Sequence, residues 1–285
     1  MGEKDISEKI LFDYNDVFAD IINVCVFDGR ENIKPEDLEN ALVHSQYKAE
    51  DGKLHEEERD IAKFWKQKKS AIALYGIENQ TKAEKIMPLR ILGYDGNSYR
   101  SQLLKDSSGE LYPVVTIVLY FGWESHWDEP KSLKKVLTIP KELNDYVNDY
   151  KIHVFEIAWL SDEQVEMFQS DFRIVAEFFT QMRKNSQYKP TPKQIKHVDA
   201  VLKMLSVFGQ TDKLDDFMKS GDMKEGLTMN KMLDEIEERG VEKGVAKGIS
   251  VLVKTLREYG NDNETIISKL IENFSLTEEE AKKYI

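Results

Sequence analysis

Two acidic residues, Asp60 and Glu78, stand eighteen residues apart, each beside a segment with the composition of a short β-strand. Glu78 opens the tripeptide Glu78-Asn79-Gln80 at the end of the apolar run 71–77. If the two segments are adjacent strands, the carboxylates lie side by side. With the backbone carbonyl of Asn79, they then offer the oxygen ligands that Mg²⁺ prefers. A cation held there can lower the pKa of a bound water and screen a scissile phosphodiester. The alternative is that both acids are solvated strand ends.

Three further side chains are candidates for a role at this site. Gln80 is two residues beyond Glu78, so on a strand it points to the same face; it can orient a water but adds no positive charge. Lys82 points the same way by alternation and could supply that charge, or it is an ordinary surface lysine. Arg90 could contact a phosphate, or it could pair with Asp95 or Glu84.

Three more blocks follow the acidic pair in a fixed order: Met87-Pro88-Leu89-Arg90, the run from Tyr112 to Gly122, and the run from Val154 to Glu163. In this order the series resembles the recombination-promoting nuclease / putative transposase family (Rpn, YhgA-like), over about residues 10–185.

The resemblance implies a fold of the PD-(D/E)xK nuclease superfamily, with an αβββαβ core, and a DNA endonuclease that depends on Mg²⁺ or Mn²⁺. It implies Asp60 and Glu78 as the carboxylate pair, and it places Gln80 where many relatives of the superfamily carry lysine. Family members often show an Asp-x-x-Phe-Lys block in the first helix. This chain reads Asp16-Val17-Phe18-Ala19-Asp20, without the lysine. Asp16 is a candidate for an additional acidic group near the metal, or a solvated helix position.

Charge is unevenly distributed along the chain of 285 residues, which has a formal net charge of −12. Residues 1–60 hold 17 acidic and 7 basic side chains, whereas residues 61–105 hold 9 basic and 3 acidic. Residues 181–203 hold 6 basic and 1 acidic. The total argues against a protein that coats nucleic acid without specificity. Positive charge nevertheless gathers around the proposed site, as phosphate contacts require. For the lysine-rich turn at 66–69, the alternative to phosphate contacts is that its lysines are simply solvated.

The pattern of apolar residues predicts a mixed α/β sheet flanked by helices, followed by an all-helical C-terminal region. We expect helices over 10–26 and 89–104, a hairpin of 59–65 with 70–77, and strands near 41–48, over 114–121 and over 152–160. The strand 114–121 is nearly all apolar, which is typical of a strand covered on both faces.

From Ser161 onward the pattern of apolar residues is helical. Ser161 predicts an N-cap, and the acids after it predict an acidic first turn. Helices are expected over 165–182 and 193–208. We therefore expect three parts: a nuclease-like domain with its helical extension over 1–208, an acidic linker over 209–226, and a helical tail over 227–285.

The tail carries a Gly-x-x-x-Gly repeat, Gly240, Gly244 and Gly248, whose glycines line one edge of a helix. Three glycines weaken a lone helix by roughly 3 kcal/mol. That cost suggests either a close helix–helix contact in a homo-oligomer or a glycine-loosened linker helix. Thr277 and Glu280 predict a capping box for a last short helix.

Other residues offer weaker signals. The five histidines lack the spacing of zinc ligands. Trp123 and Trp127 predict packing in the core and in a loop, with base stacking as the alternative. No apolar run is long enough for a membrane span, and the start lacks the order of a signal peptide. We therefore expect a cytoplasmic protein without a small-molecule cofactor.

Two functions fit these patterns. The first is a Mg²⁺-dependent DNA endonuclease connected with recombination or mobile DNA. In that protein Asp60 and Glu78 hold the metal, Gln80 positions the water, and Arg90 with Lys82 contacts the DNA backbone. The second is a catalytically silent nuclease fold that serves as a binding or assembly module through its helical tail.

Overall fold

The computed structural model describes residues 11–41, 44–48, 54–68, 70–105, 111–185, 188–209 and 228–285. The chain divides into two compact units, Met1–Leu227 and Thr228–Ile285. Of the expected acidic linker, 209–226, all but Gly209 lies outside the described residues. Among the helices that the structure describes, none combines the length and the apolar character that crossing a bilayer demands.

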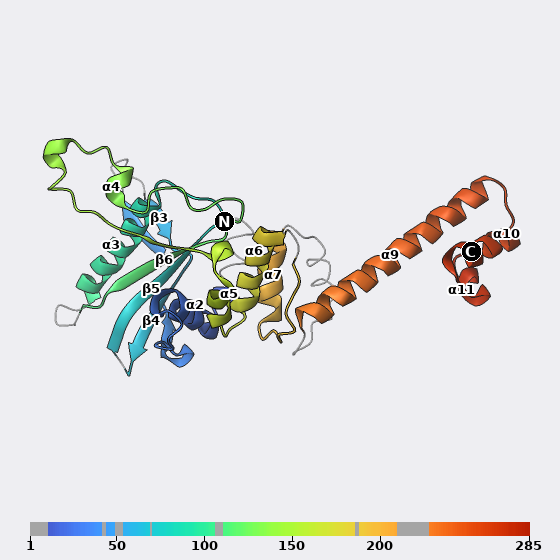
Figure 1. The fold of residues 1–285 in the computed structure, drawn as a ribbon, viewed down its shortest axis with the longest axis horizontal. Helices are drawn as coiled ribbons and strands as arrows, with labels where there is room; N and C mark the ends of the chain where they lie inside the picture. Colours follow the sequence, from blue (N-terminus) through green and yellow to red (C-terminus); the bar gives the residue numbers. More distant parts are fainter. Residues whose placement is uncertain are drawn as a thin grey trace. The chain divides into compact units, whose positions relative to one another are not determined.

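A five-stranded mixed sheet forms the centre of the first unit, with the strand order β1-β4-β5-β6-β7 (Figure 1). Its strands are β1 (Leu38–Asn40), β4 (Ile61–Gln67), β5 (Ser70–Gln80), β6 (Val114–Tyr120) and β7 (His153–Glu156). The β1–β4 and β4–β5 pairs are antiparallel, whereas β5, β6 and β7 run parallel. A separate two-stranded sheet pairs β2 (His44–Lys48) with β3 (Leu54–Glu58).

The expected hairpin is confirmed as β4 and β5, and Lys68 in its turn has a positive φ of 58°. β5 is longer than the apolar run suggested, because its pairing with β6 continues to Gln80 opposite Tyr120. Glu78 and Asn79 therefore lie inside the central strand. Ile61, the first residue of β4, is opposite Ile77, so Asp60 comes next to Glu78.

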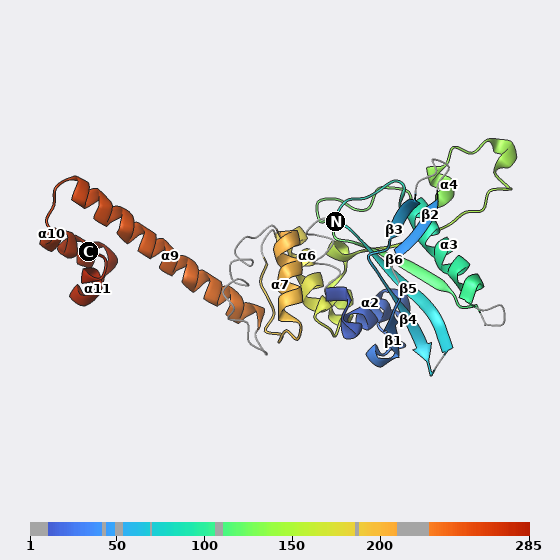
Figure 2. The ribbon, with the colours of Figure 1, turned by 180° about the vertical axis from the view of Figure 1, so that it is seen from behind.

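Helices cover both faces of this sheet (Figures 1 and 2). On one face, α3 (Met87–Lys105) packs Met87, Ile91 and Tyr94 against Val118 and Tyr120 of β6. On the other face, the ring of Phe121 contacts Phe172 and Phe179 of α6 (Phe172–Asn185). The helix α2 (Asn15–Phe27) packs beside α6. The expected helices around 10–26 and 89–104 are thereby confirmed, as is the strand near 114–121.

Lys63 of β4 is fully buried and fixes the start of α2. Its ammonium group donates hydrogen bonds to the carbonyl of Asp13 at 2.6 Å, Asn15 Oδ1 at 2.7 Å and Asn40 Oδ1 at 2.6 Å. Burial lowers the pKa of Lys63, and the charge of Asp13 opposes that shift. A buried charge needs such partners, and here they tie α2 and β1 to the middle of β4.

The prediction of one helix over 165–182 is wrong. The structure has α5 (Asp162–Met167) and α6, separated by residues 168–171. Asp20 of α2 accepts hydrogen bonds from the backbone N–H groups of Gln169 and Ser170, at 3.0 and 2.8 Å. These tertiary hydrogen bonds hold the chain in a non-helical turn. The N-cap at Ser161 is confirmed, as a capping box with Gln164.

Two further predictions extend too far. The strand expected over 152–160 ends at Glu156 and continues as the 3₁₀ helix η3 (Ile157–Trp159). The helix expected over 193–208 begins only at Val198, as α7 (Val198–Gly209). The remaining short elements are η1 (Pro35–Asp37), α4 (Leu133–Val136) and η2 (Lys141–Leu143).

The second unit consists of α9 (Met229–Glu258), α10 (Asn263–Phe274) and α11 (Glu278–Lys282). Its buried core is formed by Ile249, Val253, Ile266, Leu270 and Ala281. The capping box of Thr277 with Glu280 is confirmed. Gly248 faces the ring of Phe274 at 3.4 Å, whereas a Cβ at Gly240 or Gly244 would meet nothing within 4 Å.

We expect the double substitution Gly240→Ala/Gly244→Ala to stabilise α9, because alanine costs about 1 kcal/mol less than glycine in a helix. The added methyl groups meet no other described atom. Helicity by circular dichroism and the midpoint of thermal unfolding should both rise. A lower midpoint, with a smaller mass by light scattering, would instead show that a second copy of the chain packs against this edge.

Candidate active site

Asp60 and Glu78 are linked by hydrogen bonds in both directions. The backbone N–H of Asp60 donates to Glu78 Oε1 at 3.2 Å, and the backbone N–H of Asn79 donates to Asp60 Oδ2 at 2.8 Å. Each carboxylate therefore reaches across to the strand of the other. The β4–β5 hairpin brings the two acids together although eighteen residues separate them in the chain.

The carboxylate of Glu78 lies in an unfavourable electrostatic environment. Its side chain is fully buried. Burial first, and then the charge of Asp60, raise the pKa of Glu78 to about 8, while the charges of Arg90 and Arg59 and the N–H of Asp60 oppose that shift. A cation bound between the two acids would oppose the effects of burial and of the Asp60 charge on Glu78, because an opposite charge favours the ionised form.

Arg90 reaches the pair from α3. Its Nη2 lies 3.4 Å from Glu78 Oε2 and 3.1 Å from the hydroxyl of Tyr94, and its Nη1 lies 2.7 Å from Glu84 Oε2. The structure therefore shows the second of the two roles predicted for Arg90, in which the guanidinium pairs with acids. The side chain is still 34% exposed, so part of the guanidinium faces solvent beside the carboxylates.

A buried ion pair fixes the residue that precedes Asp60. Arg59 Nη2 donates to Asp95 Oδ1 of α3 at 2.9 Å, and both side chains are buried. The hydroxyl of Thr116 on β6 donates to the same carboxylate at 2.5 Å, and so does the hydroxyl of Tyr150. One buried acid therefore connects the start of β4 with α3, with β6 and with the segment before β7.

Gly76 of β5 makes room for this arginine. A Cβ at this position would lie 2.7 Å from Cδ of Arg59 and 2.9 Å from the hydroxyl oxygen of Thr116. Any larger residue would push the Arg59 side chain away from Asp95. Sequence patterns did not predict this pair; its only signal in the sequence is Arg59 directly before Asp60 and Asp95 in the helix that follows.

The oxygen donors at the pair suit a hard cation. The N–H of Asn79 points toward Asp60. Since the N–H and C=O of one strand residue point to the same side, the carbonyl of Asn79 faces Asp60 too. Its side chain alternates to the opposite face, where the structure gives the amide no hydrogen-bond partner. Two carboxylates and one carbonyl leave room for waters, as Mg²⁺ requires. Within the described ranges, no group of three or more His, Cys, Asp and Glu side chains could hold a metal ion.

The other predicted residues take different positions. Gln80 is the last residue of β5, is partly exposed, and accepts a hydrogen bond from the N–H of Phe121 through its backbone carbonyl at 2.8 Å. Lys82 lies two residues further on, in the wall of a pocket beyond the strand end. Both are thus on the strand of Glu78 or directly after it, and neither is placed against the carboxylates by a hydrogen bond that the structure describes.

Asp16 holds together two helical parts of the first unit. Its Oδ2 accepts a hydrogen bond from Lys196 Nζ at 2.7 Å, and His197 Nε2 lies 3.0 Å from the same carboxylate. Burial of Asp16 opposes ionisation, but the hydrogen bonds with Lys196 and His197 outweigh it and lower the pKa of Asp16. The ring of His197 also stacks on Tyr14 at 3.7 Å. These contacts join α2 to the segment before α7, and the structure does not link Asp16 to the carboxylate pair.

A mixed sheet flanked by helices, with paired carboxylates at the start of one strand and inside the next, defines an α/β protein with a candidate cation site. The chain belongs to the putative transposase, YhgA-like family, the Rpn family, whose model matches residues 37–213. That membership associates the chain with DNA-processing enzymes. No curated protein and no solved structure matches the chain.

We expect Asp95→Ala to lower the free energy of unfolding by about 3–5 kcal/mol, because it leaves the buried charge of Arg59 without its partner. The double variant Arg59→Met/Asp95→Leu should recover a large part of that loss, since both charges are then removed. Urea unfolding of the three proteins measures the difference. A loss under about 1 kcal/mol in Asp95→Ala would contradict the burial of this pair.

Without divalent cations, Glu78 should make stability fall as pH rises. Its pKa is about 8 in the folded chain, against an ordinary value of 4.5 for a glutamate carboxyl. The folded state thus binds the proton more tightly, and the stability from this group is complete below about pH 4.5 and lost through about pH 8. We expect Glu78→Gln to be more stable than the native chain above pH 8, by up to a few kcal/mol. Urea unfolding in chelator measures this difference. A gap that does not grow with pH would contradict it.

Proposed function

We propose that the chain is a Mg²⁺-dependent DNA endonuclease of the PD-(D/E)xK type, with Asp60 and Glu78 as the metal-binding carboxylates. The observation that carries the proposal is the two-way hydrogen bonding of these acids across β4 and β5. The order of elements supports it: apart from the separate β2–β3 sheet, the chain runs through α2, β1, β4, β5, α3 and β6, as the αβββαβ core requires. Family membership supports DNA as the substrate.

In this proposal each residue of the site has a separate role. Asp60, Glu78 and the carbonyl of Asn79 hold the ion and fix its position against the sheet. The bound Mg²⁺ supplies an acidified water and screens the phosphate. Gln80, at the end of the same strand, orients the water that attacks phosphorus. The attacking water would release a proton to solvent as its oxygen forms the new P–O bond, one ester P–O bond would break, and the departing oxygen would take a proton from solvent.

Positive charge near the reacting phosphate comes from Arg90 rather than from a strand lysine. Its guanidinium lies 3.4 Å from Glu78 Oε2 and is partly exposed. A planar guanidinium suits a phosphate because it can donate two parallel hydrogen bonds. We infer that Arg90 contacts the DNA backbone, and that it supplies part of the electrostatic stabilisation that Gln80 does not. Lys82, which follows the end of the strand that carries Glu78, adds a second contact to the DNA strand.

A catalytically silent module is the second candidate, because a fully buried Glu78 also suits a purely structural acid. Cation binding separates the two proposals without any need for cleavage. A ligand that binds only the folded state raises the unfolding midpoint. Mg²⁺ should therefore stabilise the native chain and leave Glu78→Gln unchanged.

We expect the native chain to nick supercoiled plasmid in Mg²⁺, and Glu78→Ala to be slower by roughly a hundredfold or more. Removing a side chain that only hydrogen-bonds to a metal ligand typically lowers metal affinity or activity 10–100-fold, and removing a ligand should lower them at least as much. Agarose gels of plasmid over time measure the rate.

The matched control is Glu142→Ala, which removes an exposed acid of η2 and should cleave like the native chain. Equal nicking by native protein and Glu78→Ala would remove Glu78 from the chemistry. Mg²⁺ that neither stabilises the native chain nor supports cleavage would favour the silent module.

A further inference from the structure

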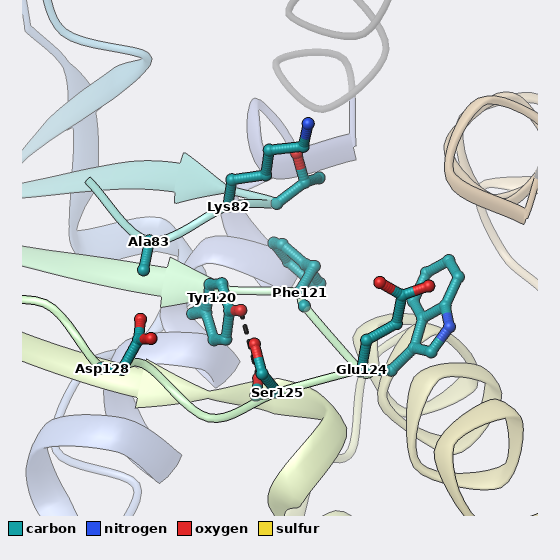
Figure 3. Close-up of a pocket in the computed structure, with 10 residues that line it drawn as sticks. Lys82, Ala83, Tyr120, Phe121, Glu124, Ser125 and Asp128 are labelled. Carbon is teal, nitrogen blue, oxygen red and sulfur yellow. Dashed lines mark hydrogen bonds between the residues drawn. The ribbon is translucent and has the colours of Figure 1, made fainter.

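A pocket of about 320 Å³ lies just beyond the ends of β5 and β6 (Figure 3). Its wall is formed by two segments, each directly after a strand: Thr81, Lys82 and Ala83 after β5, and the stretch from Tyr120 to Ser125 with Asp128 after β6. We call it the strand-end pocket. Its volume is at the lower end of the range for small-molecule sites. In parallel sheets, ligands bind beyond the carboxyl ends of the strands.

Hydrogen bonds hold the loop around this pocket in one conformation. The hydroxyl of Tyr120 donates to the carbonyl of Ser125 at 3.1 Å (Figure 3). The indole N–H of Trp159 donates to the carbonyl of Gly122 at 3.1 Å. Further along, the backbone N–H of Trp127 donates to Glu156 Oε2 at 3.1 Å. The pocket is therefore formed before any ligand arrives.

Gly122 allows Tyr120 to close one wall. A Cβ at position 122 would lie 2.1 Å from the hydroxyl oxygen of Tyr120, which is too close for any side chain. The ring of Tyr120 is buried and packs edge-on against Trp127 at 5.4 Å. The strand end thus needs glycine to keep this wall in position.

Strand β5 carries Glu78 and ends directly before the first segment of the strand-end pocket. Lys82 is four positions beyond Glu78, and this length of chain spans at most about 14 Å. Along the helix axis of B-form DNA, the phosphates of one strand follow each other at about 3.4 Å. A DNA strand whose phosphate lies at Asp60 and Glu78 therefore reaches the pocket within roughly four nucleotides.

The polar groups at the pocket favour a neutral base over a phosphate. Glu124 and Asp128 are exposed acids on the loop, and Lys82 is an exposed base on the other segment. Two carboxylates repel a phosphate, but they accept hydrogen bonds from an exocyclic amino group such as the N4 group of cytosine. Lys82 can donate to a carbonyl on the same base edge. Trp123, which is half-buried, adds an aromatic surface that suits an unstacked base.

We propose that the strand-end pocket binds an unpaired pyrimidine of the DNA strand and prefers cytosine to thymine. Glu124 or Asp128 accepts from the N4 amino group, and Lys82 donates to the O2 carbonyl. Thymine presents a carbonyl where cytosine has its amino group, so it faces a carboxylate with no hydrogen to share. The inference rests on the proposed function, because the DNA strand reaches the pocket from the carboxylate pair.

The test is binding of fluorescent single strands of equal length, oligo(dC) and oligo(dT), measured by anisotropy in chelator at one salt concentration. We expect the native chain to bind oligo(dC) about fivefold or more tightly than oligo(dT). Glu124→Ala/Asp128→Ala should bind both equally. The control Glu142→Ala/Asp145→Ala makes the same change of charge at exposed acids outside the pocket and should keep the preference. Trp123→Ala should weaken both complexes by about fivefold or more.

Equal binding of the two strands by the native chain would overturn the proposal. So would no binding of either strand, or a preference that survives in Glu124→Ala/Asp128→Ala. The plasmid assay separates this result from the proposed function. Cleavage without a base preference rejects the pocket alone, whereas a base preference without cleavage rejects the nuclease and leaves the pocket.

Discussion

The buried carboxylate of Asp95 is the contact on which the candidate site depends. It binds the guanidinium of Arg59 and accepts hydrogen bonds from the hydroxyls of Thr116 and Tyr150. Through it, helix α3 and strand β6 set where β4 begins, and Asp60 is the next residue. On the other face of the sheet, the ammonium of Lys63 does the same for α2 and β1. β4 is therefore fixed by a buried charge on each side.

This arrangement explains why the pKa of Glu78 is raised. Arg59 lies nearby, but its guanidinium is engaged with Asp95. Arg90 is shared between Glu78 and Glu84. At Glu78, burial and the neighbouring charge of Asp60 therefore outweigh the opposing charges of the two arginines. A raised pKa such as that of Glu78 is typical of functional groups.

Sequence patterns predicted the parts of the fold that depend on local order. The β4–β5 hairpin, α3 and β6 follow from strand alternation and helical spacing, and the meeting of Asp60 with Glu78 follows from the hairpin. The rest depends on contacts between distant segments. Asp95 is 36 residues from Arg59 and 55 from Tyr150, and Asp16 is 180 from Lys196. The break between α5 and α6 depends on Asp20, 149 residues away, so no local pattern could indicate it.

The limits of family similarity and of the folding unit differ at the N-terminus. The family model begins at residue 37, whereas the hydrophobic face of α2, with Val17, Phe18 and Ile21, is fully buried. A fragment cut at the start of the match would remove two of the three oxygen acceptors of Lys63 and uncover an apolar groove along α6. We expect such a fragment to aggregate or to remain unfolded. Residues that precede the family match are thus still required to cover the sheet that the match contains.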